Sequence, residues 1–593
     1  MKKKLTAFLL ATLMLMGTVA CSGNQEGNSS GGQASSGGSS QNQETAWKPV
    51  DSSQYEPDAA AGETDDRAFM KFENTVDVHI GRGVSATDTS LEENGATVED
   101  NYFTQYLKDT YNINVITDWY TAEGANYNQK VSTLIASNSL PDALVTSERN
   151  YMLMAARDGQ LADLGEVFNQ YASRQVLDIV GAAGDVAIDK ATDGGVLYSL
   201  PGLDVQASEI CIYYIRQDWL DELKLEVPKT TADMEKVAKA FIDAGKCSYA
   251  IEGPAANTRT YCTFLASSPG ICTFDAVYQA CNATPGYFLK GEDGKVYYGS
   301  TTPEFKDALS LLADWYKKGI INPEMGVQTD SMQNINAGKV GIYMCSWWGL
   351  GYGNFSAFKN DPTANWQAYP LYTNDGEWNI HMGNLGNGYT IVNSKASEDV
   401  KKAVIVMNNI HVRDEAMLVE ETKQSIGYFP LRNNMAASDE SEYTHNVLLS
   451  IARGETTIDD YDLEGTAYKH LKEDILSLPE VFTNMDWAKD DFATVNDMDV
   501  THNNFARMYS LMITDRPAAT LEPDNVIRSV SYNMTENTEK YWTNLIAMED
   551  EFVQQVITGK KSLDEFDTFV SDWENQGGSD ILQDMQNIAD GKE

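Results

Sequence analysis

Basic residues are scarce in this chain of 593 residues. Its 44 lysines and arginines are outnumbered by 87 aspartates and glutamates, which gives a formal net charge of −43 at pH 7. A surface this acidic repels nucleic acids, anionic lipid headgroups and acidic polymers at long range, although a local basic pocket can override it. We therefore expect no nucleic-acid partner. A second long hydrophobic stretch is also absent from the sequence, so nothing after the N-terminus is expected to span a membrane.

Cysteine and histidine are few and are not spaced as metal ligands. No two cysteines form a CxxC pair and the six histidines are dispersed, so neither a zinc site nor a thioredoxin-like site is predicted. Six cysteines follow Cys21, and the sequence cannot give their pairing, so buried thiols and one or two disulfides both stay open. These six are Cys211, Cys247, Cys262, Cys272, Cys281 and Cys345.

The common catalytic motifs are missing as well. The sequence has no GxSxG elbow, no HExxH pair and no Walker-type phosphate loop, and its glycine-rich run at 349–353 lacks the lysine of a phosphate cradle. Asn496, Asp497 and Asp499 suggest calcium, but the spaced glycine and glutamate of an EF-hand are not there. Acidic residues are so numerous that no glycosidase pair can be singled out. We expect no cofactor, no metal and no enzymatic activity.

The N-terminus is arranged like an export signal. MKKK is followed by an apolar run at 5–16, by small residues and by Cys21. The run is too short to cross a hydrocarbon layer of about 30 Å comfortably. The segment resembles a bacterial lipobox, in which Cys21 is lipidated after residues 1–20 are removed. Thr18 departs from that motif, which usually has leucine there. Plain secretion is the alternative.

A polar tract separates Cys21 from the rest of the chain. Residues 22–46 consist mostly of Gly, Ser, Asn and Gln, a composition that behaves as a flexible coil. We assign 21–70 to the lipidated cysteine and a linker, which would hold a folded body roughly 25–35 Å from its anchor. The sequence thus predicts a lipid-anchored protein on the outer face of the cytoplasmic membrane.

Strand and helix patterns alternate between residues 75 and 150. Val76, Val78 and Ile80 fall on one face at a period of two, which predicts a strand. Further strands are expected at 113–116 and in PDALVTSE, with a helix before each of them. This β-α-β-α-β order predicts an α/β fold in which helices cover a parallel sheet.

Open α/β sheets bind ligands beyond the carboxyl ends of their strands. The side chains expected at that edge follow the three predicted strands, and each of them could equally be an exposed loop residue. They are Arg82 after the first strand, Trp119 and Tyr120 after the second, and Glu148, Arg149 and Asn150 after the third.

The clearest helix begins after Thr302, whose hydroxyl can cap it. Trp315 lies on the apolar stripe of this helix and is predicted to be part of the core. Thr231 is expected to cap an earlier helix. A strand is predicted at 389–392, and from about residue 433 the pattern is mainly helical and acidic.

Two tryptophans stand side by side after a predicted strand at 340–344. On a continuing strand the side chains of Trp347 and Trp348 would face opposite sides, so at most one could easily belong to the core. The glycines that follow favour a loop, where an indole can stack on the apolar face of a ligand. Packing between lobes is the alternative interpretation.

The chain resembles the extracellular solute-binding lipoproteins of ABC importers, specifically the large oligosaccharide-binding branch of the family 1 type. The resemblance covers roughly residues 75–430 and rests on the order and spacing of segments that are individually loose. These segments are LIASNSLPDALV, GGVLYSLPG, IYYIRQDWLDELKLEVPKTTADM, FKDALSLLADWYKKGIINPE, AGKVGIYMCSWW and GYTIVNSKASEDVKKAVIVMNNI. Many relatives carry a DPNGNG-type calcium loop, but the corresponding place here reads AGKCSYAIEG, so calcium is not expected.

This resemblance implies two periplasmic-binding-protein-like lobes, each a sheet flanked by helices, with a ligand cleft between them. Lobe 1 would comprise 71–200 and 388–430, and lobe 2 would comprise 201–387 and 431–593. Crossing segments would fall near 200–210, 384–388 and 428–432. The residues implied to face or border the cleft are Tyr213, Tyr214, Trp347, Trp348 and Asn384.

The function that the resemblance implies is the capture of a neutral oligosaccharide outside the cell. Binding would favour the closed arrangement of the lobes, and the closed form would be presented to permease subunits in the membrane. We expect the protein to be a monomer. Two alternatives stay open, namely a peptide-binding importer component of the same fold and a tethered, secreted glycoside hydrolase.

Overall fold

The computed structural model describes residues 46–54 and 67–592, apart from short gaps at 86–87, 89, 124, 257, 267–268, 350–355, 384–385, 387, 423, 464–466, 488–493 and 503. The chain separates into two units, 1–45 and 46–593, and all described residues belong to the second. The expected signal peptide, Cys21 and Asn384 lie outside the described residues. Among the described helices, none combines the length and the apolar character that crossing a bilayer requires.

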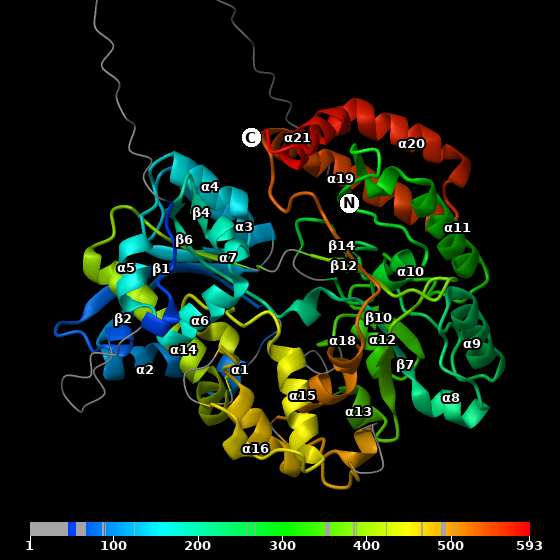
Figure 1. The fold of residues 1–593 in the computed structure, drawn as a ribbon, viewed down its shortest axis with the longest axis horizontal. Helices are drawn as coiled ribbons and strands as arrows, with labels where there is room; N and C mark the ends of the chain where they lie inside the picture. The colour runs from blue at the N-terminus through cyan, green and yellow to red at the C-terminus, as the bar shows by residue number, and fades with distance from the viewer. Residues whose placement is uncertain are drawn as a thin grey trace, which may run out of the picture. The chain divides into compact units, whose positions relative to one another are not determined.

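A mixed five-stranded sheet organises the first part of the chain (Figure 1). One strand, β1, pairs in parallel with β2 and β3, which confirms the predicted parallel order of these three. Another, β13, pairs antiparallel with both β3 and β6. The complete sheet is therefore mixed, and the prediction of a parallel sheet was wrong for these two pairings. In spatial order the strands are β2 (Ile113–Ala122), β1 (Val76–Val84), β3 (Ala143–Thr146), β13 (Tyr389–Val392) and β6 (Ser199–Pro201).

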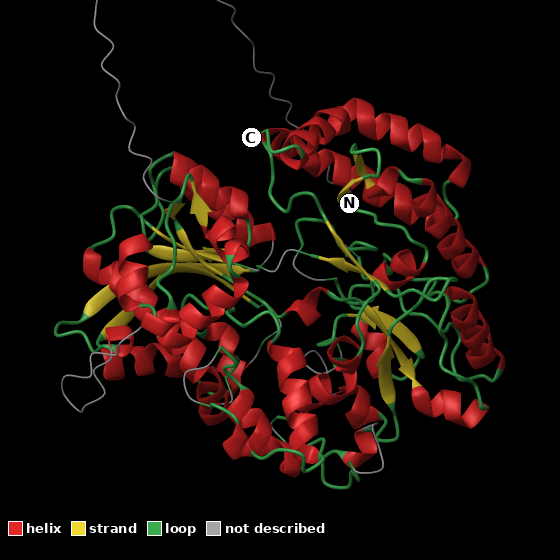
Figure 2. Cartoon of the chain, in the orientation of Figure 1, coloured by secondary structure: helices red, strands yellow, loops and turns green. Residues whose placement is uncertain are grey.

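Helices cover both faces of this sheet (Figure 2). Ala143 and Leu144 are neighbours on β3 and belong to different cores, because successive side chains of a strand point to opposite faces. The core that contains Ala143 is formed with α2 (Tyr102–Tyr111), α5 (Gly165–Tyr171), α6 (Arg174–Ala183), α7 (Asp185–Ala191) and α14 (Glu398–Thr422). The core that contains Leu144 is formed with α3 (Ala125–Ala136) and α4 (Arg149–Arg157). We call this sheet with its helices the five-stranded half.

Residues 46–50 are held against the five-stranded half. The backbone amide of Trp47 donates to the carbonyl oxygen of Gly195 at 2.8 Å, and its indole Nε1 donates to that of Gly165 at 3.1 Å. The indole also meets the ring of Phe168 edge-on, with 5.6 Å between centroids. Part of the segment that composition assigns to the linker is therefore bound to the folded body.

A three-stranded antiparallel sheet organises the second part of the chain. Its middle strand, β7, contributes Tyr213 to one core and Tyr214 to another, so both faces of the sheet are covered. The strands are β10 (Ile342–Cys345), β7 (Ile212–Arg216) and β11 (Trp366–Tyr369), in spatial order. We call this sheet, with the elements that share its two cores, the three-stranded half.

Two helices of this half show how the sequence sets their ends. The hydroxyl of Thr302 accepts from the backbone of α11 (Pro303–Lys317), and Trp315 is fully buried; both predictions are confirmed. The cap of α9 (Thr231–Asp243) is Thr230, so the prediction of Thr231 was wrong by one residue. Asp233 decides the position, because it exchanges hydrogen bonds with Thr230 in a capping box.

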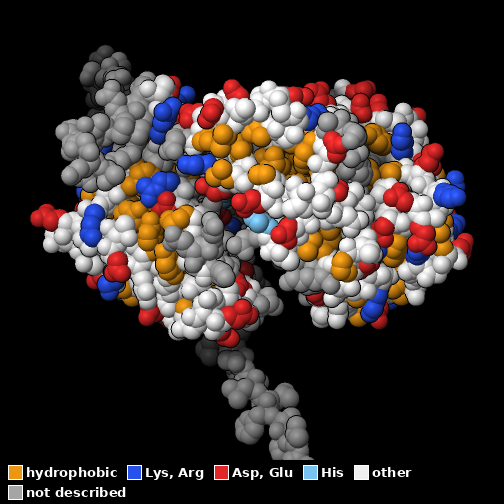
Figure 3. All heavy atoms as spheres, turned by 90° about the horizontal axis from the view of Figure 1, so that it is seen from below, with side chains coloured by type: hydrophobic (Ala, Val, Ile, Leu, Met, Phe, Trp, Pro, Cys, Tyr) orange, Lys and Arg blue, Asp and Glu red, His pale blue; other side chains and the backbone are white. Residues whose placement is uncertain are grey.

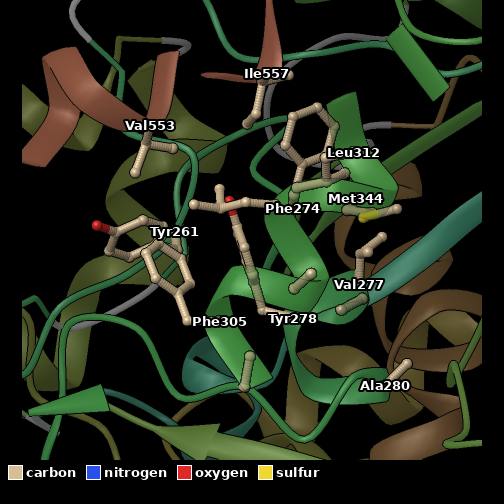
Figure 4. Close-up of a cluster of buried hydrophobic side chains, with 14 of the residues drawn as sticks. Tyr261, Phe274, Val277, Tyr278, Ala280, Phe305, Leu312, Met344, Val553 and Ile557 are labelled. Carbon is tan, nitrogen blue, oxygen red and sulfur yellow. The ribbon is translucent and has the colours of Figure 1, made fainter. Parts of the chain in front are cut away.

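The C-terminal region completes the two cores of the three-stranded half. The core that contains Tyr214 is joined by α15 (Glu440–Ala452), α16 (Leu471–Val481), α17 (Phe505–Tyr509) and the π-helical turn η9 (Ser510–Thr514). The other core is joined by α19 (Glu536–Ile557), α20 (Phe566–Trp573) and α21 (Ser579–Ala589). Figure 4 shows Val553 and Ile557 of α19 beside Tyr261, Phe305 and Leu312. The predicted helical character of this region is confirmed.

Candidate functional site

The chain passes three times between the two halves. The first passage leads from β6 to β7, the second from β12 (Asn379–Met382) to β13, and the third from α14 to α15. The first lies between the other two: Gly202 donates its amide to the carbonyl oxygen of Gly388 at 2.6 Å, and Leu203 donates to that of Asn434 at 2.8 Å. The passages fall where crossings were expected, while the bounds assigned to the lobes stay a prediction.

A cavity of about 320 Å³, which we call the tryptophan cavity, borders the first and third passages. Figure 3 shows a hollow between the two halves with charged and histidine side chains at its floor. The tryptophan cavity is lined by Asp204, Val205, Ser208, Trp347, Trp348, Glu415, Arg432, Asn434, Ala436, Glu440, Ser441, Lys469, His470 and Arg507. Both halves contribute, because Glu415 belongs to α14 and most of the remaining side chains come from the three-stranded half or the passages.

The two tryptophans of this cavity differ in what their side chains can do. Trp347 is 6% exposed, and its indole Nε1 donates to the hydroxyl of Ser208 at 3.1 Å. Its carbonyl oxygen accepts from the hydroxyl of Tyr214 at 2.9 Å and from that of Thr514 in η9. Trp348 is only half-buried. Trp347 is therefore fixed to the passage, and Trp348 offers the ring that a ligand can reach.

Opposite charges line the walls of the tryptophan cavity. Lys469 contacts Glu415 at 2.6 Å across the two halves, and Arg507 contacts Glu440 at 3.4 Å. Burial alone would raise the pKa of Glu415, but the charges of Lys469 and Arg432 hold it well below its usual range. Burial raises the pKa of Glu440 to about 7, although the charge of Arg507 opposes this. The cavity thus offers fixed donors and acceptors beside a flat ring.

A second cavity, of about 330 Å³, lies at the carboxyl ends of β1, β2 and β3 and is called the β-edge cavity here. Arg82 lines it, but it lies within β1, which continues to Val84, and not after the strand as predicted. Its guanidinium donates to the carbonyl oxygens of Gly427 and Tyr428 at 2.7 and 2.8 Å, so it holds the start of the third passage. Burial lowers the pKa of Arg82 to about 10. Arg432 lines both this cavity and the tryptophan cavity, which makes the two neighbours.

A third cavity, of about 550 Å³, is lined by residues of both halves and includes the predicted residue Arg149. The guanidinium of Arg149 donates to the carbonyl oxygens of Asp189, Lys190 and Thr192 at 2.5–3.2 Å, which ties α4 to the end of α7. Burial lowers the pKa of Arg149. The remaining lining residues include Lys190, Arg528, Ser531, Tyr532 and Asn533.

Three other predicted residues of the five-stranded half do not line these cavities, and two of them, Trp119 and Tyr120, lie within β2 and not after it as predicted. Trp119 packs against Gly81 and meets the ring of Tyr127 at 5.6 Å between centroids. Tyr120 is 49% exposed. Glu148 accepts a hydrogen bond from the side chain of Asn128 at 3.1 Å, and burial raises its pKa.

The structure places Tyr213 and Tyr214 inside the cores. The prediction that they face or border a cleft was therefore wrong. Both are 0% exposed, because β7 is the middle strand of its sheet and is covered on both faces. The hydroxyl of Tyr213 donates to the carbonyl oxygen of Pro228, and that of Tyr214 donates to that of Ser346 at 2.6 Å. Tyr214 supports the tryptophan cavity from within the core, because its hydroxyl also donates to the carbonyl oxygen of Trp347.

Several site residues have no signal in the sequence. Glu440, Lys469, His470 and Arg507 belong to the acidic helical region after residue 433, where no motif marks them. Within the part of the chain that the structure describes, no three His, Cys, Asp or Glu side chains gather as metal ligands. The six cysteines after Cys21 are free thiols there.

Comparisons with known proteins point to one group. A family model described as bacterial extracellular solute-binding protein matches residues 101–450, more than half of the chain. Lipoprotein LipO of Bacillus subtilis is 24% identical over 226 residues, which are 37% of this chain and 41% of LipO. The fructooligosaccharide ABC transporter substrate-binding protein FusA of Streptococcus pneumoniae is 27% identical over 224 residues, which are 35% of this chain and 39% of FusA. The matches thus span about two fifths of the length of these curated relatives.

Solved structures show the same fold over most of the chain. The structure of S. pneumoniae FusA in complex with kestose has a TM-score of 0.55 at 15% identity and covers 87% of this chain and 99% of that one. A solute-binding protein from Bifidobacterium longum infantis, described as HMO-binding, has a TM-score of 0.55 at 14% identity and covers 87% of this chain and 98% of that one. The fold is therefore the two-lobed periplasmic-binding-protein fold, as predicted.

Proposed function

The chain belongs to the bacterial extracellular solute-binding protein family, and on this premise we propose that it captures a carbohydrate outside the cell for an ABC importer. The names of relatives support the importer and the carbohydrate, since FusA is described as a fructooligosaccharide-binding component of an ABC transporter. The observation that supports it most is the tryptophan cavity, where the half-buried ring of Trp348 stands among fixed polar side chains. A flat ring with hydrogen-bonding groups around it suits the alternating apolar faces and hydroxyls of a sugar.

We propose further that the ligand is a neutral oligosaccharide. Three acids (Asp204, Glu415, Glu440) and three bases (Arg432, Lys469, Arg507) line the tryptophan cavity, so their formal charges cancel. The net charge of −43 disfavours the approach of acidic polymers. Ligand binding would favour closure of the two lobes about the three passages, and the closed form would deliver the sugar to permease subunits. No catalytic step is part of this proposal.

The same proposal includes attachment of the protein to the cell surface. Residues 1–20 would be removed during export, and Cys21 would receive the lipid that anchors a monomer to the outer face of the cytoplasmic membrane. The relative LipO is described as a lipoprotein, which supports this placement. Lobe 1 is assigned to 71–200 with 388–430, and lobe 2 to 201–387 with 431–593.

Isothermal titration calorimetry with a panel of neutral oligosaccharides, acidic oligosaccharides and peptides tests the proposal. Trp348→Ala is expected to raise the Kd for the bound sugar about thirtyfold, since truncating an aromatic anchor costs about 2 kcal/mol. Tyr297→Ala is the matched control, because this ring is 38% exposed on β9 (Val296–Tyr298) and does not line the three cavities.

The outcomes separate the candidate functions. Saturable binding of a neutral sugar that depends on Trp348 and not on Tyr297 supports the proposal. Binding of peptides in place of sugars would assign the chain to a peptide importer. Steady release of reducing ends from the sugars would instead reveal a hydrolase.

A further inference from the structure

Lys190 and Glu209 are a buried base and a buried acid that form no hydrogen bond with each other. Lys190 lies on α7 and is 6% exposed, and Glu209 ends η4 (Gln206–Glu209) and is 1% exposed. Among the described residues, neither the amine of Lys190 nor either carboxyl oxygen of Glu209 has a hydrogen-bond partner. Burying an ionised group without a partner is costly, so this arrangement calls for a physical explanation.

The two residues belong to different halves of the protein. Helix α7 packs Ala187 and Ala191 into the core of the five-stranded half. Next to Glu209, Ser208 accepts a hydrogen bond at its carbonyl oxygen from Ser346 of the three-stranded half, at 2.6 Å. A bond between Lys190 and Glu209 would therefore join the two halves.

The passages run directly beside the Lys190 amine. A Cβ atom placed on Gly386 of the second passage would lie 2.6 Å from this amine and 2.9 Å from the carbonyl oxygen of Gly202 in the first passage. Glu209 lies in the first passage and is fixed to the three-stranded half through Ser208, so movement of the five-stranded half relative to this segment would change the separation of Lys190 and Glu209.

Burial acts on both groups in the direction of neutrality. It lowers the pKa of Lys190 to about 7 and raises that of Glu209 to about 8, so the usual order of a lysine and a glutamate is inverted. The other charged groups that act on them are Arg149 and Asp204 at Lys190, and Arg528 and Asp204 at Glu209. While the two side chains are apart, Glu209 is mostly a neutral carboxyl group near pH 7 and Lys190 is divided between amine and ammonium, which lowers the cost of burying them.

We propose that Lys190 and Glu209 form an interlobe latch, which is apart in the present arrangement and pairs when the lobes close. On pairing, the O–H bond of the Glu209 carboxyl breaks and an N–H bond forms at Lys190, which leaves an ammonium–carboxylate pair. This transfer holds for molecules in which Lys190 is an amine; where Lys190 is already an ammonium group, the Glu209 proton goes to solvent on pairing. The latch rests on the closure that the proposed function includes, but not on the identity of the ligand.

Single-molecule energy transfer on the ligand-free full chain tests the latch. Dyes are attached through non-natural amino acids at Met154 and Tyr297, which are exposed and lie in the five-stranded and three-stranded halves. The variants are K190M, E209Q, the double variant K190M/E209Q and the charge swap K190E/E209K. The control is K306M, which removes a lysine that is 34% exposed and contacts Asp567 at 3.2 Å.

We expect each single variant to reduce the compact population relative to the extended one by about tenfold or more, because a buried pair loses one member. The double variant should resemble the single ones, and the charge swap should restore the wild-type ratio. If the charge swap does not fold, equality of the double and single variants supplies the same evidence.

Unchanged populations in the single variants, or additive losses in the double variant, would overturn the latch. A wild-type chain with one distance that no variant alters would overturn it too. Failure of every sugar in the calorimetric panel would reject the proposed function and leave these ligand-free distances as an independent result.

Discussion

Glu415→Gln removes the charge that joins the two halves across the tryptophan cavity. Glu415 of α14 contacts Lys469 at 2.6 Å, and the two side chains are 13% and 4% exposed. The variant leaves the ammonium group of Lys469 buried without its charged partner. Loss of one member of such a pair costs about 3–5 kcal/mol, which is much more than the amide of glutamine can offset.

The same helix provides a matched control. Glu398→Gln breaks a contact with Lys401 at 2.7 Å, but Glu398 is 72% exposed. Exposed pairs of this kind contribute about 0–1 kcal/mol. The two variants make the same chemical change at two depths, so their difference measures the effect of burial and not of the substitution itself.

The effect of Glu415→Gln should depend on pH in a defined direction. The folded-state pKa of Glu415 is held well below its usual range, mainly by Lys469 once the opposing effect of burial is overcome. A carboxyl group of this kind adds stability above its unfolded pKa of about 4.3 and loses it as the pH falls through the folded value. The difference between the wild type and the variant should therefore be full at pH 7 and shrink in acid.

Amide hydrogen exchange read by mass spectrometry is the suitable assay, because a two-lobed chain need not unfold in one step. Peptides from α14 and α16 should lose protection equivalent to about 3–5 kcal/mol in Glu415→Gln and to less than about 1 kcal/mol in Glu398→Gln. Equal losses in the two variants, or a loss that grows in acid, would refute the reasoning.

Two further predictions use the same measurement. Arg82→Met removes the donors that hold the third passage, so residues 426–429 should exchange faster, whereas Arg157→Met, at an exposed pair, should leave them unchanged; equal exchange in the two variants would contradict this role. Glu549→Ala removes the fully buried acceptor of the Tyr261 and Tyr298 hydroxyls and should cost α19 about 2–4 kcal/mol of protection, against little for the exposed Glu551→Ala. Unchanged protection of α19 in Glu549→Ala would show that the tyrosines do not depend on this carboxylate.

Local patterns were sufficient for much of the fold. The alternation of Val76, Val78 and Ile80 identifies β1 because one face of that strand is buried, and Thr302 marks the start of α11 because its hydroxyl caps the helix. The antiparallel pairing of β13 with β3 and β6 could not be derived in this way. Its partners lie far along the chain, and the local pattern of a strand says nothing of its direction in the sheet.

The candidate site divides along the same line. The rule for carboxyl ends of strands led to Arg82, and the pair of neighbouring tryptophans led to Trp348. Tyr213 and Tyr214 were misplaced because the family resemblance assigned them to the cleft, whereas the unbroken apolar run that begins β7 is typical of a strand covered on both faces. Lys469 could not be predicted from the sequence, since only the third passage and the packing of the helices after it bring that residue to Glu415.

The contacts of Trp47 determine where the linker to a lipid anchor would leave the folded body. Because residues 46–50 are bound to the five-stranded half, only about 25 residues separate Cys21 from the folded body, and a coil of that length would reach roughly 25–30 Å. An anchored molecule would therefore be attached to the membrane through the five-stranded half alone. The three-stranded half could then close over a sugar without displacing the segment that leads to the lipid anchor.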